Sequence, residues 1–137
     1  MTRLLSTLLG ATLLLASCSK EGSNTTTTTT GNPTSVTGTW KLVRITGGFG
    51  GIDMAPEPGE NKSVTFRSDN SCTTIFGTDT VNTTYSLRID SSVSYRSLRN
   101  FVTIADNNRL LYSFAHDTMT IEMDGIADGT TEWMVRD

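Results

Sequence analysis

Few residues in this chain of 137 could carry catalytic chemistry. The single histidine, His116, stands beside Asp117, and the only cysteine apart from Cys18 is Cys72. An imidazole can activate a thiol as a nucleophile, but the two side chains must lie within hydrogen-bonding distance. Here Cys72 and His116 are far apart in the sequence, and an isolated His–Asp pair is common on protein surfaces. We therefore expect Cys72 to be a small buried residue and the protein not to be an enzyme.

The acidic residues near the C-terminus do not form a metal-binding pattern. Asp124, Asp128 and Glu132 follow one another at intervals of four, with glycines between them. A calcium loop instead places its acidic ligands at alternating positions. We interpret the two aspartates as residues of hairpin turns, and we expect neither a metal nor another cofactor.

A glycine-rich stretch at residues 46–61 is the most unusual part of the C-terminal region. Four glycines flank Phe49, and two prolines follow. A phosphate-binding loop would continue into Lys-Ser/Thr and a helix, and this stretch does not. Long connections are often lids or binding loops. Phe49 therefore either contacts a ligand as an apolar plug or tucks into the core.

The elements that must position these residues are short β-strands. Apolar and polar residues alternate with period two, as in Val64 and Phe66 against Ser63 and Thr65, and turn signals recur about every ten residues. No segment carries a helical stripe. We predict strands over 38–46, 62–68, 71–77, 81–90, 92–97, 100–105, 109–115 and 117–123, with a closing strand over 130–136.

This pattern predicts an all-β domain over residues 36–137. Evenly spaced neighbouring hairpins indicate an antiparallel meander of about eight strands, which closes into an up-and-down barrel or folds into a β-sandwich. Closure removes exposed sheet edges, so we favour the barrel. The alternation places Val81, Tyr85, Leu87 and Ile89 together on its buried face.

The N-terminus predicts export. Arg3 precedes 13 mainly apolar residues, too few to span a bilayer and typical of a signal peptide. Leu15-Ala16-Ser17-Cys18 resembles the lipobox of bacterial lipoproteins. The resemblance implies that residues 1–17 are removed and that Cys18 carries the lipid, rather than forming a disulfide with Cys72.

Residues 18–35 then form a tether rich in threonine and without a large apolar side chain, which cannot offset its ordering entropy. Its length is about 55 Å when fully extended and roughly 20 Å as a coil. The mature chain has ten basic and 14 acidic side chains, a formal charge of −4. That charge argues against nucleic acid as a partner, so the lipid alone attaches the protein to the membrane.

Gly38-Thr39-Trp40 opens the predicted domain. Together with the lipobox, the threonine-rich tether, the GGFGG loop and a final strand ending in aromatic-x-x-Arg, it resembles the small lipocalin-like lipoproteins of Gram-negative bacteria. This resemblance implies that Trp40 packs under the closed end of the barrel and that Arg136 stacks on it. Cation–π stacking of this kind contributes about 0.5–2 kcal/mol.

The resemblance also implies a candidate ligand site. An eight-stranded barrel is either filled by its own side chains or holds one small ligand. The inward aromatic residues are Phe66, Tyr85, Tyr112 and Phe114. We expect a non-catalytic envelope protein that binds a small hydrophobic, amphipathic or glycan ligand at the open end near Phe49. The alternative is a filled barrel that binds or inhibits a protein partner.

Two short patterns concern location and modification. Ser19-Lys20-Glu21 weakly resembles a signal for display on the cell surface. We expect the protein on the outer membrane, at its periplasmic face or at the cell surface, and we expect it to be a monomer. Asp79-Thr80-Val81 and Asp117-Thr118-Met119 resemble an O-glycosylation pattern of such lineages. This makes Thr80 and Thr118 candidate glycosylation sites.

Overall fold

The computed structural model describes residues 35–105 and 108–137. The predicted signal peptide, Cys18 and the tether up to residue 34 lie outside the described residues. Within them, no helix is long and apolar enough to cross a membrane.

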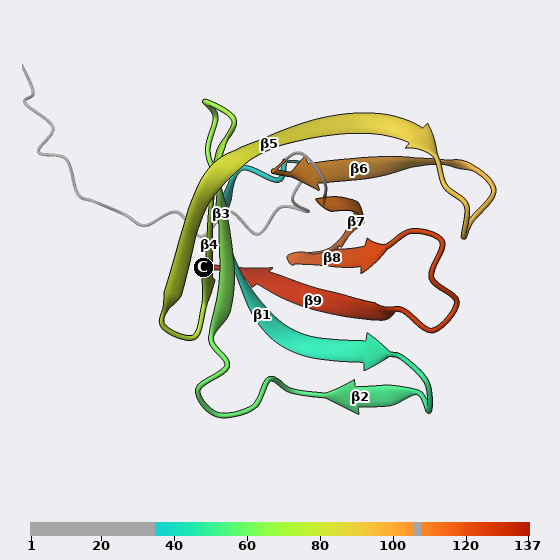
Figure 1. Cartoon of the computed structure of the whole chain (residues 1–137), viewed down its shortest axis with the longest axis horizontal. Helices are drawn as coiled ribbons and strands as arrows, with labels where there is room; N and C mark the ends of the chain where they lie inside the picture. The colour runs from blue at the N-terminus through green and yellow to red at the C-terminus, as the bar shows by residue number, and fades with distance from the viewer. Residues whose placement is uncertain (1–34, 106–107) are drawn as a thin grey trace, which may run out of the picture.

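The described chain forms nine antiparallel strands (Figure 1). Eight of them close into an up-and-down barrel, because β1 pairs with β9 as well as with β3. This confirms the predicted barrel and excludes the β-sandwich. The strands are β1 (Gly38–Gly47), β2 (Ile52–Met54), β3 (Lys62–Phe66), β4 (Ser71–Phe76), β5 (Asp79–Ser91), β6 (Leu98–Ile104), β7 (Asn108–Ala115), β8 (Thr118–Met123) and β9 (Thr130–Arg136).

Two strands change partners along their length. The first half of β1 pairs with β3, while its last three residues pair with the short additional strand β2. The first half of β5 pairs with β4 and the second half with β6. Figure 1 shows the result: β3, β4 and the start of β5 cover one side, and the remaining strands fan out from them.

The core fills the barrel at the end where the C-terminus lies. Strand alternation directs apolar side chains from all eight barrel strands or their flanks toward one another. The buried cluster consists of Val36, Trp40, Val64, Phe66, Cys72, Tyr85, Val102, Met119, Ile121 and Met134. Such a close-packed set is the filled option for an eight-stranded barrel.

Two predicted segments are corrected by the structure. Residues 92–97 form a loop between β5 and β6, not a strand. Ser92 N–H donates to Ser97 O, and the Ser92 hydroxyl and two backbone N–H groups of the loop donate to Asp124. The predicted loop at 46–61 contains β2, which folds back on β1 as a hairpin.

The predicted apolar face of β5 is only partly buried. Tyr85 lies in the core, but Val81, Leu87 and Ile89 on the same face are exposed. The physical reason is the length of β5: its 13 residues extend beyond the part of the barrel that the core fills. The core face of β5 is therefore exposed at Val81 on one side of Tyr85 and at Leu87 and Ile89 on the other.

Candidate functional site

Trp40 and Arg136 meet at the end of the barrel near the C-terminus. The Arg136 guanidinium lies over the Trp40 ring, 4.6 Å from its centroid, and donates to the carbonyls of Ser35 and Thr37 at 2.9 Å. The indole N–H of Trp40 donates to Val36 O at 2.6 Å. This arrangement is the one the family resemblance implied. It fastens the segment that leads into β1, so the pair has a structural role.

The predicted ligand-binding aromatic residues are packed against one another. The rings of Phe66 and Tyr85 lie 4.8 Å apart, and Phe114 lies 5.7 Å from both Tyr112 and Trp40. Phe66 and Tyr85 are buried, and the Tyr85 hydroxyl donates to Arg67 O. Burial raises the pKa of Tyr112. These four residues therefore contribute to the core, and Phe49 does not join them.

Phe49 lies at the tip of the β1–β2 hairpin with 93% of its surface exposed. The suggestion that it tucks into the core is wrong. Gly48, Gly50 and Gly51 around it all have positive φ, so the turn uses conformations that side chains disfavour. The hairpin carries the ring away from the core instead of folding it inward.

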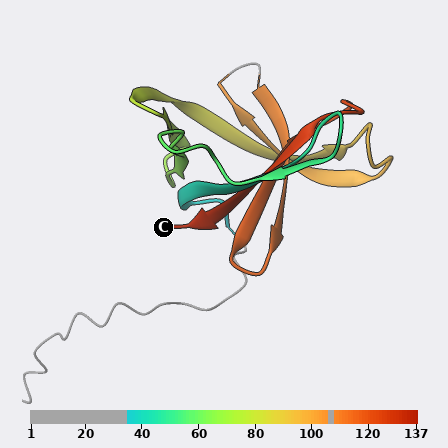
Figure 2. The same cartoon turned by 90° about the horizontal axis from the view of Figure 1, so that it is seen from below.

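Three loops meet at this end of the molecule, which we call the loop end: residues 48–51, 92–97 and 124–129. Figures 1 and 2 both place them opposite the C-terminus. Hydrogen bonds join them, because Gly48 N–H donates to Gly129 O at 3.1 Å, and Gly125 N–H donates to Ser94 Oγ at 2.8 Å. The loop end is thus one connected surface.

Asp124 holds the β5–β6 loop in place. Its carboxylate accepts hydrogen bonds from the Ser92 hydroxyl at 2.8 Å and from the backbone N–H groups of Val93 and Ser94 at 3.0 Å. Desolvation of the carboxylate favours its neutral form, but these hydrogen bonds outweigh that effect and lower the pKa of Asp124 to about 2. The sequence correctly predicts Asp124 in a turn, but it does not predict that Asp124 holds the β5–β6 loop.

Large apolar side chains project from each loop of the loop end. Val93 is 72% and Ile126 51% exposed, in addition to Phe49. Ile89, Leu98 and Met123, at the adjacent strand ends, are also exposed. Leu98 lies on the same face of β6 as the core residue Val102, and Met123 on the same face of β8 as Ile121. The core face of these strands therefore continues into this apolar surface.

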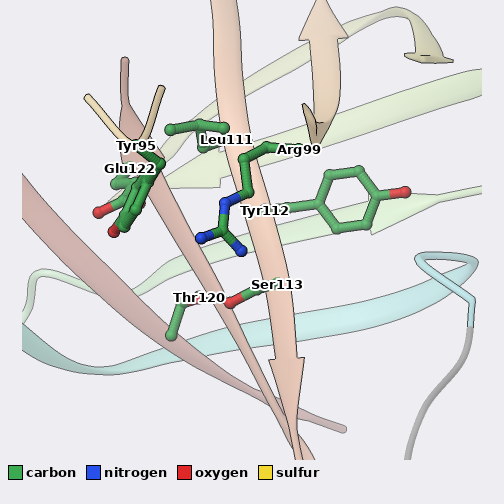
Figure 3. A pocket seen from close by; sticks show the side chains of 7 residues that line it. All are labelled: Tyr95, Arg99, Leu111, Tyr112, Ser113, Thr120 and Glu122. Carbon is green, nitrogen blue, oxygen red and sulfur yellow. Dashed lines mark hydrogen bonds between the residues drawn. The ribbon is translucent and has the colours of Figure 1, made fainter. Parts of the chain in front are cut away.

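A pocket of about 220 Å³ lies on the opposite face of β7 and β8 from the core (Figure 3). Leu111 and Ser113 from β7 and Thr120 and Glu122 from β8 alternate with the core residues of these strands. Figure 3 shows Tyr112 pointing away from the other lining residues. The lining residues are Tyr95, Arg99, Leu111, Tyr112, Ser113, Thr120 and Glu122.

Tyr95 and Arg99 close this pocket from the side of the β5–β6 loop. The Arg99 guanidinium lies 4.6 Å from the centroid of the Tyr95 ring. The hydrogen bond to the Glu122 carboxylate raises the pKa of Tyr95. Sequence reasoning missed these residues, because the pattern predicts a strand over 92–97, which includes Tyr95. The serine-rich run at 91–94 is the signal that could have indicated a loop instead.

The side chains considered for catalysis or metal binding lie in different environments of the fold. Cys72 is a buried free thiol, and desolvation raises its pKa, which keeps it protonated. His116 lies in the exposed β7–β8 turn with a positive φ of 56°. Glu132 faces Lys62, whose ammonium donates to both carboxylate oxygens at 2.6 and 2.7 Å. Within residues 35–105 and 108–137, no three acidic, cysteine or histidine side chains gather as a metal site.

The two candidate glycosylation sites differ in accessibility. Thr80 is exposed near the start of β5, opposite Ile75, whereas Thr118 is half-buried at the start of β8. A glycan can reach Thr80 more readily than Thr118. Cys18 lies outside the described residues.

Comparisons with protein-family models, with curated proteins and with solved structures found no match to this chain.

Proposed function

We propose that this chain is a lipid-anchored protein of the outer membrane that binds a protein partner through its loop end, without catalysis. The observation that carries the proposal is the exposure of Phe49, Val93 and Ile126 on three hydrogen-bonded loops. Contiguous exposed apolar side chains on a monomer mark interaction sites, and aromatic residues and methionine are enriched in protein interfaces.

The filled core favours this function over binding of a small hydrophobic ligand inside the barrel. Small-molecule sites are concave and enclose most of the ligand. Phe66, Tyr85 and Met134 instead fill the interior, while Phe49 stands out from the surface. A protruding aromatic side chain suits insertion into a pocket of a partner, as interface anchors do.

The position of the tether supports the same assignment. Ser35, the first described residue, is held by Arg136 at the end of the barrel opposite the loop end. A lipid on Cys18 would therefore attach the molecule by the filled end. The loop end would then lie far from the point of attachment and stay free to contact soluble or surface partners.

Site-specific photo-crosslinking in the full-length protein tests this function. A photoreactive phenylalanine analogue is placed at Phe49 or Ile126, and at His116 as the matched control in another exposed turn. We expect one discrete protein adduct from the two loop-end positions and none from position 116. Equal adducts at all three positions, or native mass spectra that show a bound small molecule and no protein partner, would refute the proposal.

A further inference from the structure

The pocket on the outer face of β7 and β8 combines donors and acceptors that are not fully used by the protein. Its walls come from three separate elements: the β5–β6 loop, the start of β6, and the β7–β8 hairpin. Asp124 fixes the loop that contributes Tyr95. Asp124, which does not line the pocket, therefore fixes the position of one of its walls.

Arg99 supplies the free donors. Within the described parts of the chain, its guanidinium has no hydrogen-bond or ion-pair acceptor, and its single defined contact is the ring of Tyr95. In Figure 3 the guanidinium nitrogens of Arg99 point toward Ser113 and Thr120. A guanidinium carries five N–H donors in a fixed plane, so this group is oriented to donate to a ligand in the pocket.

Glu122 and the two hydroxyls supply acceptors. The Glu122 carboxylate accepts from Thr131 Oγ1 at 3.2 Å and from Tyr95, but a carboxylate has about four acceptor positions. Ser113 Oγ and Thr120 Oγ1 lie 2.6 Å apart. Because one hydroxyl donates to the other, the pair retains one free proton and further lone pairs.

The charges of the pocket select against ions. One guanidinium and one carboxylate face the same space. An anion that Arg99 attracts is therefore repelled by Glu122, and a cation that Glu122 attracts is repelled by Arg99. A neutral ligand with several hydroxyl groups satisfies both, because each hydroxyl donates and accepts. Leu111, buried beneath, offers an apolar contact for one face of such a ligand.

We propose that this pocket binds a single neutral sugar ring, with Arg99 donating to and Glu122 accepting from its hydroxyl groups. Its volume of about 220 Å³ is below the roughly 300–1,000 Å³ of sites for drug-sized ligands, which suits one ring rather than an extended chain. This inference is independent of the protein partner at the loop end.

Titration of the ¹⁵N-labelled protein with methyl glycosides of common neutral hexoses tests it. We expect amide shifts of Tyr95, Ser113 and Thr120 with at least one glycoside at millimolar concentrations. Arg99→Gln and Glu122→Gln should each weaken binding about tenfold, because each removes hydrogen bonds to a charged group. Arg96→Gln, in the same loop but outside the pocket lining, should bind like the unchanged protein, and unshifted core amides show that the variants fold.

Other ligands provide the contrary outcomes. If acetate or glycine moves the same amides at lower concentration than every glycoside, the pocket is a site for ions or zwitterions and the proposal is wrong. It is also wrong if no glycoside shifts these amides. An oligosaccharide ending in the active hexose should shift the same residues. Binding of the oligosaccharide alone would exclude a single-ring site.

Discussion

Single residues at the two ends of the barrel have opposite roles. Trp40 is completely buried, and its indole N–H and ring face are both used by neighbours. Phe49 has almost no contact with the rest of the chain. Both are large aromatic residues, so residue type does not distinguish an aromatic residue that stabilises the fold from one that is available to a partner.

Replacement of Arg136 by alanine should lower the free energy of unfolding by about 1–3 kcal/mol, since it removes the stack on Trp40 and two hydrogen bonds to backbone carbonyls. Denaturant unfolding measures this change. The control is Lys41→Met, which breaks the exposed pair with Asp137 and should cost less than about 1 kcal/mol. Equal losses in the two variants would contradict a structural role for the stack.

Phe49→Ala should leave the free energy of unfolding unchanged within about 0.5 kcal/mol, because the side chain is exposed. Phe66→Ala, the matched core variant, should cost about 3–5 kcal/mol through the cavity it creates. Thermal or urea unfolding of both variants measures these changes in the free energy of unfolding. A loss of several kcal/mol on replacing Phe49 would mean that the ring is part of the core and not available to a partner.

At the scale of elements, the β5–β6 loop depends on an acceptor from a distant loop. Residues 92–97 are predicted as a strand, but three of their donors converge on Asp124, about thirty positions further along the chain. This loop contributes Val93 to the loop end and Tyr95 to the pocket. Asp124 is therefore expected to control the order of both surfaces.

The pKa of Asp124 sets the pH range over which its carboxylate stabilises the β5–β6 loop. Its value in the folded protein, about 2, is below the ordinary 3.8, so the stabilisation is fully present above the ordinary value. It is lost as the pH falls through about 2, when the carboxylate becomes protonated. Amide NMR of Val93 and Ser94 should show a titration in this range.

Asp124→Asn should abolish that titration and raise the exchange rates of the loop amides already at neutral pH, because a neutral amide oxygen is a weaker acceptor. Asp128→Asn, in the same loop but outside these hydrogen bonds, is the control and should leave both unchanged. A persisting low-pH titration at Val93 in the Asp124→Asn protein would assign it to another group.

At the scale of the whole molecule, attachment and recognition are expected to lie at opposite ends. The filled end carries the segment that leads to the predicted tether, and the loop end carries the exposed apolar residues. A freely rotating domain on a tether of about 20 Å can then reach partners without losing its anchor. This arrangement requires the lipid on Cys18.

Cys18→Ala should move the protein from the membrane fraction into the soluble fraction after cell disruption, because no other attachment is predicted for the mature chain. Immunoblots of the two fractions measure this shift. Cys72→Ala is the control, since its thiol is buried in the core, and it should leave the protein with the membrane. Retention of the Cys18→Ala protein in the membrane fraction would show that another feature attaches it.

Much of the barrel could be predicted from the sequence because strand formation has a local cause. The period-two patterns of Val64–Phe66 and Met119–Ile121 identified strands and their buried faces, and most predicted strand limits agree with the structure to within two residues. The failures occurred where long-range contacts override the local pattern. Leu87 and Ile89 have the alternation of buried residues but lie beyond the filled core.

The sequence by itself determined an all-β domain, the antiparallel meander and most strand ranges, since these depend on alternation and turns within short segments. Only the tertiary structure decided that the core fills the barrel at its C-terminal end, that Phe49 points outward and that Tyr95, Arg99 and Glu122 share a pocket. These properties depend on how the sheet closes. Closure brings β1 to β9 and Asp124 to Ser92, over separations that no local pattern records.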